Sequence, residues 1–240
     1  MGVIQLPGTV AVGVATLLAL LAPMATAWPP ARTAGTRLVL LHDNSGSQIL
    51  RLYYRADTRP LFQQTTSDRR DAVIRAITDH LDEADEVRVA TFGERFLISP
   101  AWLRTPKELL QAFNGIMQSG GPSPIWDALY QTVGVLEEAP GKRAVLLISD
   151  GRASGNVRSF QEALARVRDS RVIVYVAALD AAYNREINKD RPGDPTERLR
   201  ALARATGGGY AEPEIVDLAA ACARFAKAIA NPSPTLPLAR

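Results

Sequence analysis

Oxygen-bearing side chains alternate directly after an aliphatic run in "LVLLHDNSGSQIL" (38–50). Asp43, Ser45 and Ser47 stand at every second position, so an extended loop would turn all three side chains the same way. A carboxylate and two hydroxyls are hard oxygen ligands, which Mg²⁺ and Mn²⁺ prefer over nitrogen and sulfur. This stretch therefore predicts one part of a divalent cation site.

A second acid, Asp150, follows the aliphatic run "RAVLLIS" (143–149). If the two runs are neighbouring strands, Asp43 and Asp150 project into one crevice. Two like charges in a partly buried site are costly, and a bound cation removes that cost. Taken singly, each acid also fits an ordinary turn, because Asp favours turn starts and Asp150 precedes Gly151.

The elements that must position these acids alternate between aliphatic strands and amphipathic helices. This order predicts an α/β fold with a doubly wound, mostly parallel sheet covered by helices on both faces. Ligands of such folds gather beyond the carboxyl ends of strands, where the strand order reverses. The expected strands are 37–42, 86–92, 95–99, 143–149, 171–179 and 210–213, and the expected helices are 67–85, 105–117, 123–139, 157–170, 194–209 and 216–230.

Three ordered segments resemble the von Willebrand factor type A (VWA) family, in particular a bacterial, often exported branch. They are "DNSGS" (43–47), "GGPSPIWDALY" (120–130) and "LLISDG" (146–151). The resemblance covers about residues 36–230 and implies a Rossmann-like VWA fold with a metal-ion-dependent adhesion site, or MIDAS. It implies Mg²⁺ or Mn²⁺, with Ca²⁺ less favoured, and a protein partner whose acidic side chain completes the metal coordination. The ligands it implies are Asp43, Ser45, Ser47, Ser123 and Asp150.

Several residues around this set have two interpretations. Ser123 replaces the Thr usual in the family, and Ser before Pro is also a good helix cap. Asp127 suits the first turn of its helix, where a negative charge favours the dipole, and could also support the metal ligands. Asn44 lies between the ligands of the first loop. Tyr53 and Tyr54, in the long segment 48–66, either contribute to a partner-binding rim or pack inward on a helical extension.

Composition excludes other classes of site. The 240 residues carry a net charge of +3 from scattered arginines, which argues against a nucleic-acid surface. One cysteine permits no intrachain disulfide, and with only two histidines a zinc site built from Cys and His is close to excluded. His42 should point away from Asp43, because neighbouring strand residues face opposite sides, and packing is its expected role.

The N-terminal residues predict export. An apolar run (10–22) precedes "ATA" (25–27), so residues 1–27 are interpreted as a cleaved signal peptide and the protein as secreted or periplasmic. No basic residue precedes the apolar run, and the alternative is an uncleaved membrane anchor. A linker (28–36), the VWA domain (37–230) and a disordered Pro-rich tail (231–240) follow.

These observations lead to three hypotheses. The first is a non-catalytic, metal-dependent protein-binding domain. The second is a metal-assisted hydrolase, against which the sequence shows no activated nucleophile, no catalytic base and no phosphate-binding loop. The third is a metal-free VWA-like scaffold. The oligomeric state is not predicted.

Overall fold

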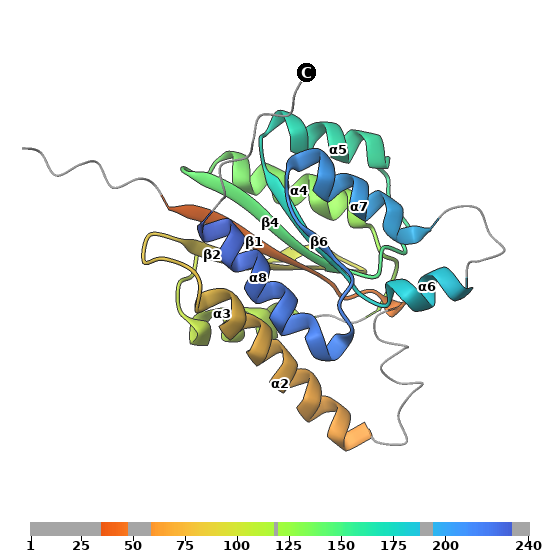
Figure 1. Cartoon of the computed structure of the whole chain (residues 1–240), viewed down its shortest axis with the longest axis horizontal. Coiled ribbons are helices and arrows are strands. Elements are labelled where there is room, and N and C mark those ends of the chain that lie inside the picture. The colour runs from red at the N-terminus through yellow and green to blue at the C-terminus, as the bar shows by residue number, and fades with distance from the viewer. Residues whose placement is uncertain (1–34, 48–58, 118–119, 188–193, 232–240) are drawn as a thin grey trace, which may run out of the picture. The chain divides into compact units, whose positions relative to one another are not determined.

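The computed structural model describes residues 35–47, 59–117, 120–187 and 194–231 (Figure 1). The predicted signal peptide, all of the linker except Gly35 and Thr36, the tail beyond Asn231, and Tyr53 and Tyr54 lie outside these residues. Thr36 already belongs to the first strand rather than to the linker.

One six-stranded sheet forms the centre of the described domain, in the order β3-β2-β1-β4-β5-β6. All neighbouring strands pair in parallel except β3, which is antiparallel to β2 at the edge. The chain fills one side of β1 first and then crosses to β4 on the other side, so the order reverses between β1 and β4. The strands are β1 (Thr36–Asp43), β2 (Glu86–Phe92), β3 (Leu97–Ile98), β4 (Lys142–Ser149), β5 (Ile173–Ala178) and β6 (Tyr210–Ala211).

Helices cover both faces of the sheet, as the aliphatic runs predict. Figure 1 shows α4, α5 and α7 on one face and α2, α3 and α8 on the other. The helices are α2 (Arg59–Thr78), α3 (Pro106–Ile116), α4 (Ile125–Glu137), α5 (Phe160–Asp169), α6 (Ala181–Ile187), α7 (Pro195–Thr206) and α8 (Leu218–Ala230), with a 3₁₀ turn at Ile215–Asp217.

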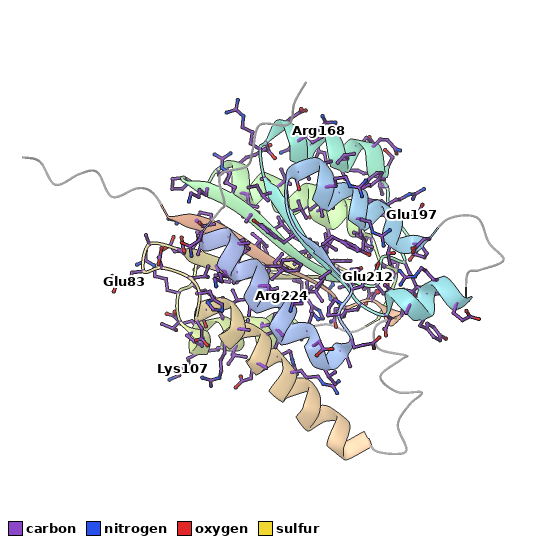
Figure 2. The ribbon with its side chains drawn as sticks, viewed as in Figure 1. Glu83, Lys107, Arg168, Glu197, Glu212 and Arg224 are labelled. Atoms are coloured by element: carbon purple, nitrogen blue, oxygen red, sulfur yellow. The ribbon has the colours of Figure 1, made fainter. Side chains whose placement is uncertain are left out.

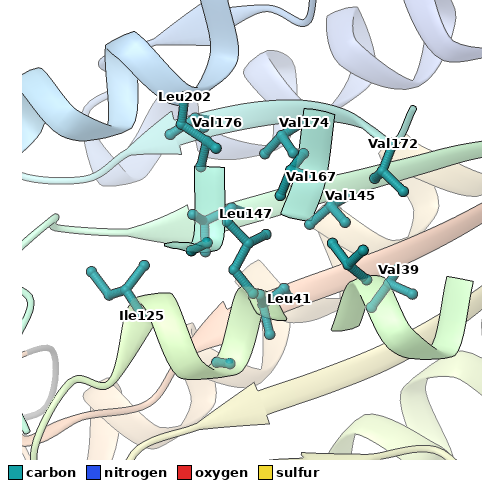
Figure 3. Close-up of a cluster of buried hydrophobic side chains, with 14 of the residues drawn as sticks. Val39, Leu41, Ile125, Val145, Leu147, Val167, Val172, Val174, Val176 and Leu202 are labelled. Atoms are coloured by element: carbon teal, nitrogen blue, oxygen red, sulfur yellow. The ribbon is translucent and has the colours of Figure 1, made fainter. Parts of the chain in front are cut away.

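The core consists of two apolar layers that alternate along the strands. Val39 and Leu41 face the helices α4, α5 and α7 in a cluster shown in Figure 3. Leu38 and Leu40, one position along, face α2, α3 and α8. Because successive strand residues point to opposite faces, a strand covered on both sides needs a continuous aliphatic run. The fold class predicted from the sequence is therefore confirmed.

Two helices differ from the sequence prediction. Helix α2 begins at Arg59, so Ser67 lies inside the helix and is not its cap, and the helix ends at Thr78 rather than at residue 85. Helix α6 was not predicted, because its seven residues carry no apolar periodicity. Helix α3 has the expected Thr105 cap, in which the Thr105 hydroxyl accepts from the Glu108 amide.

Charged side chains occupy the outer surface of the described domain. Figure 2 shows Glu83, Lys107 and Arg168 pointing away from the sheet. Among the helices that the structure describes, none combines the length and the apolar character required to cross a membrane.

Candidate functional site

The carboxylate of Asp43 lies at the carboxyl end of β1 and is only 1% exposed. Its Oδ2 atom accepts hydrogen bonds from the Ser149 hydroxyl at 2.6 Å and from the Ser123 hydroxyl at 2.9 Å. Its Oδ1 atom accepts from the Ser45 backbone amide at 3.0 Å. Three segments far apart in the sequence therefore meet at this one side chain.

The electrostatics of Asp43 favour a nearby positive charge. Burial raises the pKa of its carboxyl above the usual value, and the negative charge of Asp150 raises this pKa further. The hydrogen bonds from Ser149 and Ser45 lower the pKa and offset part of this effect. The register of β1 and β4, which pairs His42 with Ile148, puts the two acids at neighbouring strand ends, as expected at the reversal of strand order.

Asp150 is fully buried, and its carboxylate is only half satisfied. The Oδ1 atom accepts from the Arg152 amide at 3.0 Å, whereas Oδ2 has no hydrogen-bond partner among the described residues. The backbone carbonyl of Asp150 accepts from the side-chain amide of Asn184 on α6 at 2.9 Å. Gly151 follows with a φ of 79°, and a Cβ there would lie 2.7 Å from the Pro195 carbonyl oxygen.

The first loop turns into a helix sooner than predicted. The sequence suggested an extended segment through Ser47, but Gly46 and Ser47 have helical backbone conformation. The Ser45 and Ser47 hydroxyl oxygens are nevertheless 3.2 Å apart, so they still lie side by side. Asn44 is buried, and its carbonyl accepts from the Gly120 amide at 3.1 Å, which fixes the second loop against the first.

Ser123 is not the helix cap that the Ser-Pro pair suggested. The cap position of α4 belongs to Pro124, and no side chain caps this helix. The Ser123 side chain is buried, and its hydroxyl donates to Asp43 instead. Ser123 therefore belongs to the hydrogen-bond partners of Asp43 and not to the cap of α4.

Asp127 fixes the loop that follows Asp150. Its Oδ2 and Oδ1 atoms accept from the backbone amides of Val157 and Arg158, both at 2.8 Å. A further hydrogen bond joins the same loop to the start of α4, because Asn156 Oδ1 accepts from the Trp126 amide at 2.7 Å. Asp127 therefore positions the loop that follows Asp150 and does not reach Asp43 through any described hydrogen bond.

A pocket of about 820 Å³ opens beyond the carboxyl ends of β1 and β4. Its walls come from the first loop, the second loop, the loop after β4 and the start of α7. Its lining includes the hydroxyls and charged side chains of Ser45, Ser47, Ser123, Arg152, Glu197 and Arg198.

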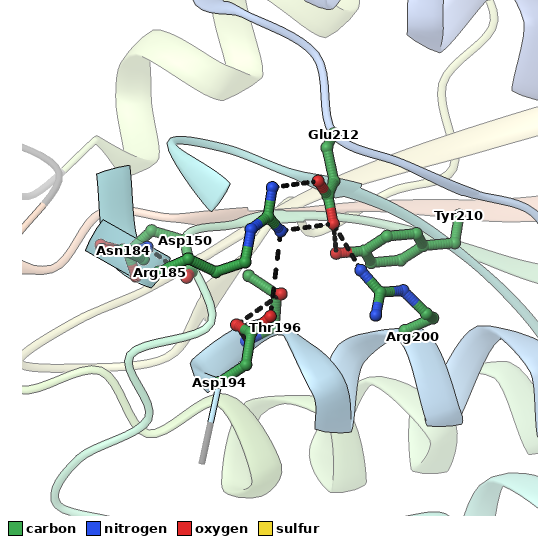
Figure 4. Close-up of polar contacts among 8 residues, drawn as sticks. All are labelled: Asp150, Asn184, Arg185, Asp194, Thr196, Arg200, Tyr210 and Glu212. Atoms are coloured by element: carbon green, nitrogen blue, oxygen red, sulfur yellow. Dashed lines mark hydrogen bonds and ion pairs between the residues drawn. The ribbon is translucent and has the colours of Figure 1, made fainter. Parts of the chain in front are cut away.

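An ionic network behind the pocket connects α6, α7 and β6 (Figure 4). The Arg185 guanidinium binds both carboxylate oxygens of Glu212, at 3.0 and 2.9 Å. Arg200 and Tyr210 also donate to Glu212, at 2.6 and 2.9 Å. The hydrogen bond from Arg185 is the main cause that lowers the pKa of Glu212 to about 2. Because Arg185 follows Asn184, the network also anchors the helix that binds the Asp150 carbonyl.

His42 packs as expected from its position on the strand. Its ring lies edge-on to Phe113 of α3, with 5.4 Å between the ring centroids. Burial lowers the pKa of His42 to about 4, and the charge of Arg70 contributes to this shift. A neutral, packed imidazole on the α3 side of the sheet matches the structural role predicted for it.

The sequence itself identifies the family of this fold. The description "von Willebrand factor type A domain" belongs to the family model that matches residues 38–202. The chain belongs to the von Willebrand factor type A family. No curated protein sequence matches the chain.

Solved structures share the VWA fold at low sequence identity. A von Willebrand factor type A protein from Catenulispora acidiphila has a TM-score of 0.62 at 15% identity, over 82% of this chain and 43% of that one. Proximal thread matrix protein 1 of the mussel byssus, described with a zinc-occupied MIDAS motif, has a TM-score of 0.58 at 14% identity, over 81% and 46%. The pilus adhesin SpaC of Lactobacillus rhamnosus GG has a TM-score of 0.62 at 12% identity, over 83% and 30%. The VWA chain thus spans less than half the length of each.

The residues present fit a hard divalent cation. The buried Oδ2 atom of Asp150 has no hydrogen-bond partner among the described residues. The hydroxyls of Ser123 and Ser149 contact Asp43, and the charge of Asp150 contributes to the raised pKa of Asp43. No group of three His, Cys, Asp or Glu side chains placed to hold a metal occurs among the described residues, so a cation here would depend on two carboxylates, hydroxyls and water. This donor set suits Mg²⁺, which keeps several waters and is bound by few carboxylates.

Two residues of the site were not identified from the sequence. Ser149 lies at the end of β4, and the register that pairs His42 with Ile148 brings it beside Asp43. Knowledge of the strand register would have predicted it. Asn184 has no comparable signal, because it lies on a short helix with no recognisable pattern.

Proposed function

We propose that this VWA domain binds a divalent cation and uses it to hold an acidic side chain of a protein partner. Mg²⁺ is the preferred ion, Mn²⁺ can replace it, and Ca²⁺ is less suited. The observation that carries the proposal is the unpartnered, fully buried Oδ2 atom of Asp150 beside Asp43. The proposed ligands are Asp43, Ser45, Ser47, Ser123 and Asp150.

Each part of the site has a separate role in this proposal. The cation, when bound, offers an open coordination position to a carboxylate oxygen of the partner. Asp43 and Asp150 supply the negative charge that attracts the ion, and burial makes their charge effective at short range. The hydroxyls of Ser45, Ser47 and Ser123 line the pocket through which a partner side chain reaches the site. The role is non-catalytic.

Two structural relatives agree with this reading. One is described with a zinc-occupied MIDAS and another is a pilus adhesin, although the identities of 14% and 12% show the fold alone. We place the protein outside the cytoplasm, because the apolar run and the "ATA" sequence at the N-terminus match an export signal. The alternative is an uncleaved N-terminal segment that anchors the same domain to a membrane.

The test is a calorimetric titration of the full chain with Mg²⁺, compared with Asp43→Asn. We expect the wild type to bind and the variant to lose binding. Without metal, Asp43→Asn should be as stable as the wild type or more stable, since it removes one of two buried like charges. With metal, only the wild type should gain thermal stability.

A matched control separates loss of the site from loss of a buried charge. Asp85 is also a buried acid and accepts from the Thr36 amide at 2.5 Å, at the opposite end of β1. Asp85→Asn should lower stability and leave Mg²⁺ affinity unchanged. Equal Mg²⁺ binding by the wild type and Asp43→Asn would refute the metal assignment.

A metal-free scaffold is the second candidate, because Ser123 and Ser149 already satisfy Asp43 Oδ2 without an ion. Capture of a partner that persists in excess chelator would favour this alternative.

A further inference from the structure

Two arginines lie on the wall of the pocket together with the three serines among the proposed metal ligands. Arg152 follows Gly151 in the loop after β4, and Arg198 lies in the first turn of α7. Both side chains are exposed. Among the ion pairs and hydrogen bonds of the described residues, neither guanidinium has a partner, so both retain their full set of donors.

Other charges near the pocket are already engaged. Asp194 accepts from the Thr196 amide at 2.8 Å and from its hydroxyl at 2.7 Å, and it faces Arg185 at 3.8 Å. Arg200, two residues beyond Arg198 on α7, binds Glu212. Of the charges on the pocket wall, Arg152, Arg198 and the exposed Glu197 have no ion-pair partner within the described part of the chain. Figure 2 shows the outward position of Glu197 at the start of α7.

The size of the pocket exceeds what one carboxylate needs. A volume of about 820 Å³ lies in the range of about 300–1,000 Å³ that holds a drug-sized ligand. A peptide segment that gives one carboxylate to the metal would thus place its neighbouring residues against the wall that carries the arginines. Guanidinium groups bind carboxylates through paired hydrogen bonds, and Glu197 beside them disfavours a doubly charged anion such as phosphate.

From this arrangement we propose that the partner segment carries two acidic side chains, one for the cation and one for Arg152 and Arg198. The inference rests on the proposed function of the metal site and adds the determinant of specificity. The two arginines select a segment with a second carboxylate over a segment with a single one.

The experiment measures binding of short peptides, with both ends chemically blocked, to the full chain. The full chain is kept in solution with a mild detergent and is saturated with Mg²⁺. One probe carries a single Asp among glycines, and three others carry a second Asp separated from the first by one, two or three glycines. Dissociation constants come from nuclear magnetic resonance titrations. We expect the best two-acid probe to bind about tenfold more tightly than the one-acid probe.

Variants assign this preference to the arginines. Arg152→Ala combined with Arg198→Ala should reduce the preference to about twofold or less, whereas Arg168→Ala, an exposed arginine on α5, should keep it. Glu197→Gln should increase the preference. Arg152→Glu combined with Arg198→Glu should prefer a probe with Asp and Lys over the two-acid probe, an inversion that a misfolded variant cannot produce.

The outcomes separate this inference from the proposed function. If Mg²⁺ and the one-acid probe bind but no two-acid probe binds more tightly, or if the double alanine variant keeps the preference, the inference is wrong and the metal site stands. If the wild type does not bind Mg²⁺ alone, the proposed function and this inference both fail.

Discussion

The hydroxyl of Ser149 donates a 2.6 Å hydrogen bond to the carboxylate of Asp43 across 106 residues of sequence. This contact joins the ends of the two central strands, and both side chains are buried. The same hydroxyl accepts from the Gly151 amide at 3.1 Å, so it also fixes the turn that follows Asp150. Ser149 thus connects the two halves of the proposed metal site without belonging to its predicted ligands.

Replacing Ser149 by Ala should weaken both folding and the metal site. The variant removes a buried hydrogen bond to a carboxylate, so we expect a loss of about 1–3 kcal/mol in the free energy of unfolding. Mg²⁺ affinity should also fall, because the hydrogen bond that lowers the pKa of Asp43 is lost. Denaturant unfolding and calorimetry measure the two effects.

The control for this variant is Ser159→Ala, which removes the cap of α5. It should cost about 1 kcal/mol of stability and leave Mg²⁺ affinity unchanged. If Ser149→Ala behaves in the same way as this control, Ser149 supports the fold alone.

Replacing Asp127 by Ala should release the loop after β4. The amides of Val157 and Arg158 lose their acceptor, so their hydrogen exchange should become faster while exchange in β4 itself is retained. We expect a stability loss of about 1–3 kcal/mol. Unchanged exchange at these two amides would show that the rest of the loop holds them without Asp127.

Replacing Glu212 by Gln tests the ionic network behind the pocket. The folded protein keeps the pKa of Glu212 at about 2, below the ordinary value of 4.5. When folding lowers the pKa of an acid, the resulting stabilisation is complete at a pH above the pKa of the unfolded chain. It disappears as the pH falls through the pKa of the folded protein. The difference in stability between wild type and variant, about 1 kcal/mol at neutral pH, should therefore shrink between pH 4.5 and about 2.

Thermal unfolding across this pH range provides the measurement. Glu214→Gln is a suitable control, since its exposed carboxylate lies two residues away. If the difference in stability between wild type and Glu212→Gln persisted near pH 2, the charge of Glu212 would not be its cause.

Cys222 should be unreactive in the folded protein. Its side chain is fully buried in α8, and burial raises the pKa of the thiol to about 12. Because the thiolate is the reactive form, labelling by an aromatic disulfide reagent should be at least about a hundredfold slower than in denaturant. Fast labelling of the native chain would show that α8 opens readily from the sheet.

The sequence was sufficient for those parts of the molecule in which pattern alone decides structure. Continuous aliphatic runs locate the buried strands, and their alternation with helices predicts a doubly wound sheet in which the strand order reverses. The structure shows that this reversal lies between β1 and β4. From the sequence, Asp43 and Asp150 could be placed together only on the condition that their strands are neighbours, which the structure fulfils.

Features that depend on tertiary contacts could not be predicted in this way. Ser123 has the local signature of a helix cap, but the packed second loop directs its hydroxyl to Asp43 instead. Asn184 lies on a short helix whose position depends on the pairing of Arg185 with Glu212. In both cases long-range contacts determine the role of the side chain.

The adjacency of β1 and β4 also has a consequence for biosynthesis. These strands are synthesised far apart in time, and parallel pairing over such a separation is slow to form. A nascent polypeptide that has not yet produced β4 holds only half of the acidic pair, so under the proposed function it would not hold the cation. Capture of the proposed cation would then follow the pairing of β1 with β4, and would stabilise only chains in which these two strands have met.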